Sequence, residues 1–194
     1  MTDVLSDNAT GADNQQERLI YIGWVIGFVD GEGCFSIGFV KQSGNGNRKG
    51  YKTGYQVAHR FAVTQGVKSI ECLEDLKKFF GVGRLFINKR HDNHKEHLAQ
   101  YVVDKREDLL KTIIPFFEQN QPRTSKRYDF EQFARCMHKI ADGEHLMHQG
   151  LIEIIQIAQT MNHRKSREDI IRILRDYTPD PEMLSLQKLF SGKI

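Results

Sequence analysis

Apolar and polar positions recur along this chain with two different periods, and the changes between them outline its secondary structure. Helical spacing predicts helices over about residues 16–30 and 67–80, and from about 105 onward with an interruption at Pro115. Two-residue alternation predicts strands over about 34–42, 55–65, 84–90 and 99–104. The predicted order is therefore α-β-β-α-β-β-α. In such an α+β fold, hairpins make the sheet antiparallel and leave one of its faces open.

Helical spacing continues after Arg127, in segments at about 127–140, 143–162, 166–177 and 180–191. We expect a core over residues 16–135 and a helical extension over residues 136–194 that packs on this core. Residues 1–15 are polar and acidic, which predicts a disordered tail. The sequence shows neither a membrane-spanning apolar run nor a signal-peptide pattern. Three widely spaced cysteines outside any CxxC arrangement indicate buried thiols in a reducing, intracellular compartment.

Charge is distributed unevenly along the chain, which has 28 Lys and Arg against 25 Asp and Glu. Four of the acids precede Arg18, so residues 18–194 carry a net charge of +7. Residues 33–70 contain six Lys or Arg and no acid. This window is either an idle basic surface or the binding face for a polyanion. We favour the polyanion because cations that face phosphates gain affinity through counterion release.

The stretch WVIGFVDGEG, residues 24–33, ends a helical pattern in two acids set among glycines. Gly23 and Gly27 are spaced i,i+4 and form a flat stripe on which a second helix can pack closely. Asp30 and Glu32 differ by about 200° around such a helix, so they face different surroundings. Glu32 is thus predicted at a helix-to-strand junction, where a carboxylate and a backbone carbonyl can converge on a metal. From spacing alone, a buried helix ending in a solvated turn fits equally well.

Residues 25–33, VIGFVDGEG, resemble the LAGLIDADG motif of homing endonucleases. Asp30 matches the first acid of the motif, and Glu32 stands at the place of the second. The resemblance implies that Glu32 and the carbonyl of Gly31 bind Mg²⁺, with two or more ions per dimer. We assign Asp30 to structure, either as a cap or in a bond across a pair of motif helices.

Two further positions resemble the family. Gln65 ends a VTQ segment whose Gln lies near the catalytic centre and helps to order water. Lys126 opens KRYDF and resembles the family's lysine near the scissile phosphate, although this assignment can slip to Arg123 or Arg127. An amide can position water and an ammonium can offset phosphate charge, so both residue types suit the chemistry.

The chain contains one copy of the motif, whereas the family places two motif helices side by side. The resemblance therefore implies a homodimer with Gly23, Gly27 and Asp30 at its interface. It also implies a site-specific endonuclease that cuts both strands of a long, nearly palindromic double-stranded DNA. Two alternatives on the same fold stay open: an intron maturase that binds RNA, and a DNA-binding regulator without nuclease chemistry.

Strand alternation predicts the side chains that line the open face of the sheet and contact DNA. Gln and Arg at such positions can form bidentate contacts with adenine and guanine. The predicted DNA-contacting residues, two loop lysines included, are Ser36, Gly38, Val40, Gln42, Lys49, Lys52, Gln56, Arg60, Arg84, Phe86, Asn88, Arg90 and Gln100. Alternation also places Ala62, Thr64 and Val102 outward, and Leu85 and Ile87 inward.

Two histidine- or arginine-rich stretches have competing interpretations. His91, His94 and His97 form an HxxHxxH pattern, but no convincing fourth ligand follows, which favours a loop near the DNA backbone over a zinc site. The basic stretch NHRKSR, residues 162–167, is either a solvated turn or a phosphate clamp.

Overall fold

A computed structural model describes residues 6–42, 52–89, 96–162 and 166–176, with the backbone alone for residues 6–13. The chain begins with α1 (Ser6–Glu32), β1 (Gly33–Lys41) and β2 (Tyr55–Gly66). There follow the short helix η1 (Val67–Ser69), α2 (Ile70–Phe80), β3 (Arg84–Asn88) and β4 (Leu98–Val103). The predicted α+β class and the order of its strands and helices are confirmed.

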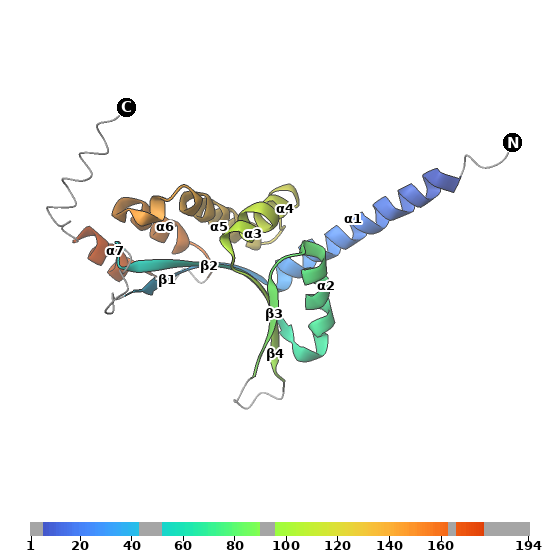
Figure 1. Ribbon diagram of the computed structural model, residues 1–194, viewed down its shortest axis with the longest axis horizontal. Coiled ribbons are helices and arrows are strands. Elements are labelled where there is room, and N and C mark those ends of the chain that lie inside the picture. The colour runs from blue at the N-terminus through green and yellow to red at the C-terminus, as the bar shows by residue number, and fades with distance from the viewer. Residues whose placement is uncertain (1–5, 43–51, 90–95, 163–165, 177–194) are drawn as a thin grey trace.

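The four strands form one antiparallel sheet in the order β1-β2-β4-β3. Phe61 of β2 lies opposite Phe35 of β1 on one side and Val103 of β4 on the other. In Figure 1, β1 and β2 run across the view while β3 and β4 run down it, so the sheet is strongly twisted. The helices α1 to α6 lie on one side of it, and the opposite face is left open, as predicted.

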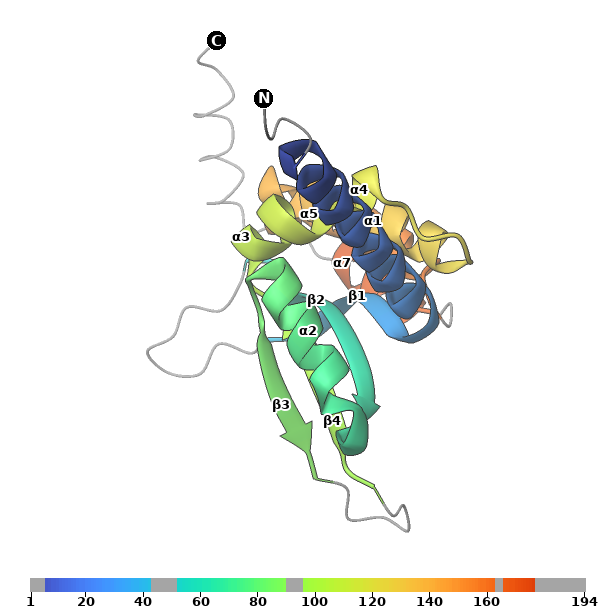
Figure 2. The ribbon, with the colours of Figure 1, turned by 90° about the vertical axis from the view of Figure 1, so that its right-hand side faces the viewer.

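The helix α1 begins at Ser6 rather than at residue 16, so the expected disordered tail is helical from that residue. Its C-terminal half packs on the core through Val25 and Val29, which are fully buried. Its N-terminal half projects away from the remaining elements (Figures 1 and 2).

The segment after β4 is continuous but changes its helical geometry near a proline. It comprises α3 (Arg106–Asp108), the wider π-helical turn η2 (Leu109–Ile113) and α4 (Ile114–Gln119). Pro115 has no N–H to donate and its ring crowds the preceding turn, so a regular α-helical ladder cannot run through it. A wider turn before the proline relieves this conflict. The interruption predicted at Pro115 is thus present as a change of helix type.

The C-terminal part consists of α5 (Lys126–Ala141), η3 (Glu144–Leu146), α6 (His148–Ala158) and α7 (Glu168–Arg175). The helix predicted over residues 180–191 lies outside the described residues. α5 crosses the predicted boundary at residue 135 without interruption, and Phe133 and Met137 on either side of it are both fully buried. The C-terminal helices therefore share one hydrophobic core with the sheet.

Phenylalanines from both halves of the chain build the centre of that core. Phe35 and Phe61 are fully buried, with ring centroids 5.0 Å apart. Phe117 of α4 and Phe130 of α5 lie 5.4 and 5.3 Å from Phe35. Because Phe35 follows the motif by two residues, this cluster anchors the start of β1 and the end of α1 against α5.

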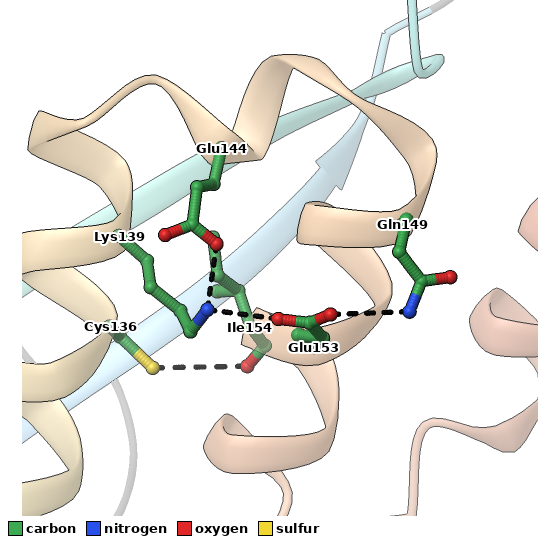
Figure 3. A network of polar contacts seen from close by, with 6 residues as sticks. All are labelled: Cys136, Lys139, Glu144, Gln149, Glu153 and Ile154. Carbon is green, nitrogen blue, oxygen red and sulfur yellow. Dashed lines mark hydrogen bonds and ion pairs between the residues drawn. The ribbon is translucent and has the colours of Figure 1, made fainter.

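A polar network fixes α6 to α5 above the apolar contacts. The ammonium of Lys139 donates hydrogen bonds to Glu144 at 2.6 Å and to Glu153 at 2.9 Å (Figure 3). Gln149 donates a further bond of 3.2 Å to Glu153. Beneath the network, the thiol of Cys136 lies 3.8 Å from the carbonyl oxygen of Ile154. The two helices are consequently joined into one layer that packs on β1.

Candidate catalytic centre and nucleic-acid interface

The junction between α1 and β1 contains no linking residue, because Glu32 ends the helix and Gly33 begins the strand. A Cβ atom at Gly33 would stand 2.6 Å from both the Cγ1 atom and the carbonyl oxygen of Val29. Only glycine permits this close approach of strand and helix. The direct turn fixes the position of Glu32 relative to the sheet.

Glu32 presents an exposed carboxylate at this junction, so its predicted place between helix and strand is confirmed. The last four carbonyl groups of an α-helix have no N–H partner within the helix, and they give its end a partial negative charge. The carbonyl of Gly31 belongs to this last turn. Carboxylate and carbonyl oxygens thus occur together at an end of α1 that attracts cations.

Asp30 is engaged within its own chain. Its carboxylate accepts hydrogen bonds from the N–H of Arg123 at 2.8 Å, and from the N–H and hydroxyl of Thr124 at 3.2 and 2.8 Å. Burial by itself would raise the pKa of Asp30, but these bonds and the nearby charge of Lys126 lower it overall. Asp30 is thus bonded to the loop that precedes α5 in its own chain, and its predicted place at a dimer interface stays a prediction.

Lys126 is the first residue of α5, and its ammonium donates a hydrogen bond to the carbonyl oxygen of Gly33. Its charge therefore lies beside the motif, one residue from Glu32. Arg127 instead forms an ion pair with Glu131 at 3.0 Å, and the bond from Arg123 to Asp30 comes from its backbone N–H. Among the three candidate cations, the structure brings the Lys126 side chain to the motif.

Gln65 is half-buried near the end of β2, opposite Ala99 of β4. Gly33 pairs with Val63, so β2 extends two residues past the start of β1 to reach Gln65. The amide thus lies at the same end of the sheet as Glu32.

The outer face of α1 is lined by glycine. Gly23 and Gly27 are exposed, and so is Gly31, with no atom within 4 Å of the place that a Cβ would occupy at any of them. Leu19 and Ile20 extend this face toward the N-terminus and are 61% and 66% exposed. An apolar helix face of this kind, without side chains over its glycine-lined part, is suited to contact with another protein surface.

The open face of the sheet carries the predicted DNA-contacting residues. Val40, Gln56, Arg60, Arg84, Phe86 and Asn88 are exposed, Ser36, Gly38, Gln42 and Gln100 are half-buried, and Lys52 is exposed in the turn before β2. Lys49 and Arg90 lie outside the described residues.

Three positions depart from the burial that alternation predicted. Ala62 and Val102 are only 6% and 0% exposed on the open face, because they occupy the two central strands and their neighbours cover them. Ile87, expected inward, is 49% exposed because β3 is an edge strand. The part of the open face that a ligand can contact is therefore divided into two polar regions, which lie on either side of the buried Ala62 and Val102.

Cross-strand pairs already hold several of the polar side chains on this face. Gln42 donates to Gln56 at 3.0 Å, and Gln100 donates to Thr64 at 2.7 Å. Arg84 donates to both carboxylate oxygens of Asp104, at 2.7 and 2.5 Å. The sequence analysis missed Asp104, although its position two residues after Val102 places it on the same face.

Two described residues of the basic stretch 162–167, Asn162 and Arg167, contact the outer edge of β1. Asn162 donates to the carbonyl of Phe35 at 2.9 Å, and Arg167 donates to that of Ile37 at 2.9 Å. The Arg167 guanidinium also lies 4.9 Å from the centre of the Phe39 ring. Edge strands expose backbone groups that need partners, and these two side chains supply them. Arg167 therefore supports the edge of β1 from within the chain. Residues 163–165, the centre of the stretch considered as a phosphate clamp, lie outside the described residues.

The cysteines are free thiols, but only Cys136 is buried as expected, and burial raises its pKa to about 12. Cys34 is exposed and Cys72 half-buried. Among the described residues, no three His, Cys, Asp or Glu side chains gather as a metal site. His91 and His94 fall outside those residues. None of the described helices has the length and apolar character needed to cross a membrane.

Residues 25–137 match the family described as LAGLIDADG endonuclease. This span covers more than half of the chain and contains the α1–β1 junction, Gln65 and Lys126. The chain belongs to the LAGLIDADG endonuclease family.

Similar proteins agree with this assignment. The "Probable intron-encoded endonuclease 2" of Neurospora crassa is 32% identical over 138 residues, which are 71% of this chain and 26% of that protein. The crystal structure of the homing endonuclease I-TnaI has a TM-score of 0.64 and 39% identity, covering 80% of this chain and 96% of that one. The I-SmaMI LAGLIDADG homing endonuclease bound to cleaved DNA has a TM-score of 0.66 and 32% identity, covering 81% and 48%. The chain therefore spans about a quarter of the Neurospora protein but nearly all of I-TnaI.

Proposed function

We propose that this protein is a site-specific DNA endonuclease that acts as a homodimer and depends on a divalent metal ion, with Mg²⁺ as the natural ion. The observation that carries the proposal is the exposed carboxylate of Glu32 at the end of α1, one residue from the carbonyl that Lys126 contacts. This centre lies at the end of a helix-free sheet face that carries Arg and Gln side chains. The relatives named as homing endonucleases support the same function.

The glycine-lined face of α1 supports the proposed homodimer. One chain supplies one Glu32, whereas cutting two strands needs an acid for each. A two-fold axis at Gly27 would bring two copies of the face together, and such an interface is self-complementary by symmetry. The empty space at Gly23, Gly27 and Gly31 allows two helix backbones to approach without side-chain obstruction.

The donor atoms at the junction fit a hard divalent cation, which prefers oxygen ligands and keeps several waters. Glu32 and the carbonyl of Gly31 would hold the ion. The equivalent groups of the second subunit and oxygens of the DNA phosphates would complete its coordination. The absence of a three-residue cluster among the described residues is consistent with a site shared in this way. When bound, the ion supplies an activated water and stabilises the leaving oxygen.

The remaining residues have separate tasks. The Lys126 ammonium offsets negative charge on the scissile phosphate, and the bond to Gly33 keeps it in place. Gln65 orders water at the same end of the sheet. Asp30 holds the loop before α5 and thereby positions Lys126. The sheet residues face the major groove, which a two-stranded ribbon can enter.

The three free thiols suit a reducing compartment, since they form no disulfide. We infer from the relatives named intron-encoded that the target is the host locus without its intron. The direct test is to incubate the purified chain with that joined locus in Mg²⁺ and to map the breaks.

We expect one double-strand break with Mg²⁺ and none with EDTA. Glu32→Gln should bind the same DNA but cut it at least about a hundredfold more slowly. Glu17→Gln, an exposed acid on the same helix, should cut at the wild-type rate. An uncut locus, or full activity in Glu32→Gln, would refute the proposal, and binding of the precursor RNA without DNA cleavage would support a maturase instead.

A further inference from the structure

Asp104 places a carboxylate on the sheet face that we assign to DNA. It follows β4 directly and faces Arg84, the first residue of β3. Both terminal nitrogens of the Arg84 guanidinium donate to it, one to each carboxylate oxygen, at 2.7 and 2.5 Å. The two side chains are 58% and 30% exposed, so the pair lies at the surface.

Neither stability nor general DNA affinity accounts for this acid. Exposed ion pairs contribute little to the free energy of folding, because water screens their attraction and the paired side chains lose conformational freedom. A carboxylate at a DNA interface repels phosphates, and an Arg–Asp pair carries no net charge with which to release counterions. The arrangement does, however, hold one arginine in a defined orientation.

The geometry of the pair determines which donors remain for a ligand. Because both terminal nitrogens point toward Asp104, the side edge of the guanidinium, made of the Nε–H and one neighbouring Nη–H, stays available. These two parallel donors match the N7 and O6 acceptors that guanine presents in the major groove. A guanidinium fixed by a carboxylate loses less conformational freedom when it forms such a pair.

We propose that Asp104 is a specificity-determining residue that positions Arg84 to read a guanine, at one base pair in each half-site. The proposal rests on the DNA-binding function proposed above. Arg60 offers an internal contrast. It is exposed on the same face, but no ion pair among the described residues involves it. Of these two arginines, Arg84 is therefore the one whose orientation an ion pair fixes before DNA binds.

The test compares variants on a library of all single-base substitutions of the joined locus, by binding in Ca²⁺ and by cleavage in Mg²⁺. In the wild-type protein, guanine at the Arg84 position should be preferred by about 5- to 150-fold, as for other bidentate Arg–guanine pairs. Asp104→Asn keeps the size of the side chain but removes its charge. It should reduce that preference several-fold and leave other positions unchanged.

Two further measurements separate positioning from a general structural effect. Asp104→Asn should bind unrelated duplex more tightly and with a steeper salt dependence, because the released Arg84 can contact a phosphate. Arg84→Lys should lose the same guanine preference, since an ammonium lacks the two parallel N–H donors of a guanidinium. Glu107→Gln is the matched control, because it also breaks an exposed ion pair, with Lys111 at 2.7 Å on α3 and η2. It should leave the base profile unchanged.

The outcomes distinguish this inference from the proposed function. A wild-type protein without any base preference would overturn both. A wild-type protein that reads bases, together with an Asp104→Asn profile unchanged within twofold at every position, would overturn only the assignment of Asp104. Loss of preference at many positions together with a lower melting temperature would also overturn it, as a structural effect.

Discussion

Asp30 and Thr124 lie 94 residues apart in the sequence, yet the Thr124 hydroxyl donates a hydrogen bond of 2.8 Å to the Asp30 carboxylate. This bond joins the motif helix to the loop that starts α5. Two residues later, Lys126 reaches back to the carbonyl of Gly33. Asp30 thus holds the loop that leads to Lys126. Under the proposed function, a defect at Asp30 should therefore reduce both stability and cleavage.

Asp30→Asn should lower the free energy of unfolding at pH 7 by about 1–2 kcal/mol, since it weakens hydrogen bonds to a charged acceptor. The lowered pKa of Asp30 means that its contribution is present above the unfolded-state value near 4 and is lost as the pH falls through the folded-state value. The stability difference between wild type and variant should therefore shrink on acidification. Urea denaturation across pH 3–7 measures it, with Glu74→Gln on α2 as control. A difference that stays constant with pH would contradict this role.

Lys126→Met should reduce cleavage by about a hundredfold or more while DNA binding persists, because the variant loses charge stabilisation at the phosphate. Arg127→Met is the matched control, since Arg127 pairs with Glu131 away from the motif. Single-turnover cleavage at a saturating enzyme concentration separates the loss in cleavage rate from any loss in DNA affinity. If Arg127→Met loses as much activity as Lys126→Met, the assignment of the cation to Lys126 is wrong.

Gly27→Ala and Gly27→Leu should weaken dimerisation in that order. Within the chain nothing lies within 4 Å of a Cβ at this position. Alanine also favours a helix over glycine by about 1 kcal/mol, so the Gly27→Ala monomer should be no less stable. Between two helices, however, the added carbons would overpack the contact at a cost of about 1–3 kcal/mol or more. Analytical ultracentrifugation gives the dissociation constant. A wild-type monomer at micromolar concentration, or a Gly27→Leu dimer as tight as wild type, would exclude this interface.

Gly33→Ala should destabilise the chain and misplace Glu32. The new Cβ would meet both the side chain and the backbone carbonyl oxygen of Val29 at 2.6 Å. Removing the side-chain contact in the double variant Gly33→Ala/Val29→Ala cannot restore the turn, because the carbonyl contact remains. We expect about 1–3 kcal/mol lower stability for Gly33→Ala, without rescue by the second substitution. Thermal unfolding and cleavage assays on both variants test this, and full rescue would show that only side-chain crowding matters.

Local sequence determined the elements of this protein and the identity of its motif. The two periods of apolar residues predict the strands and helices because each period reflects a repeating local geometry. The acids and glycines of residues 23–33 predict the helix-to-strand junction and the outward glycine face for the same reason. Pro115 marks the change of helix geometry through its own covalent structure. These features depend on residues close together in the chain.

Tertiary structure decided the features that join distant segments. The sequence favoured Lys126 but left a possible slip to Arg123 or Arg127 open. The packing of α5 against the motif brings the Lys126 side chain to Gly33. Alternation places Val102 on an open face, whereas its central position in the sheet buries it. The Arg84–Asp104 pair depends on the stagger between β3 and β4, which strand periodicity does not encode. Such contacts are set by the arrangement of whole elements in space, so no local pattern could have revealed them.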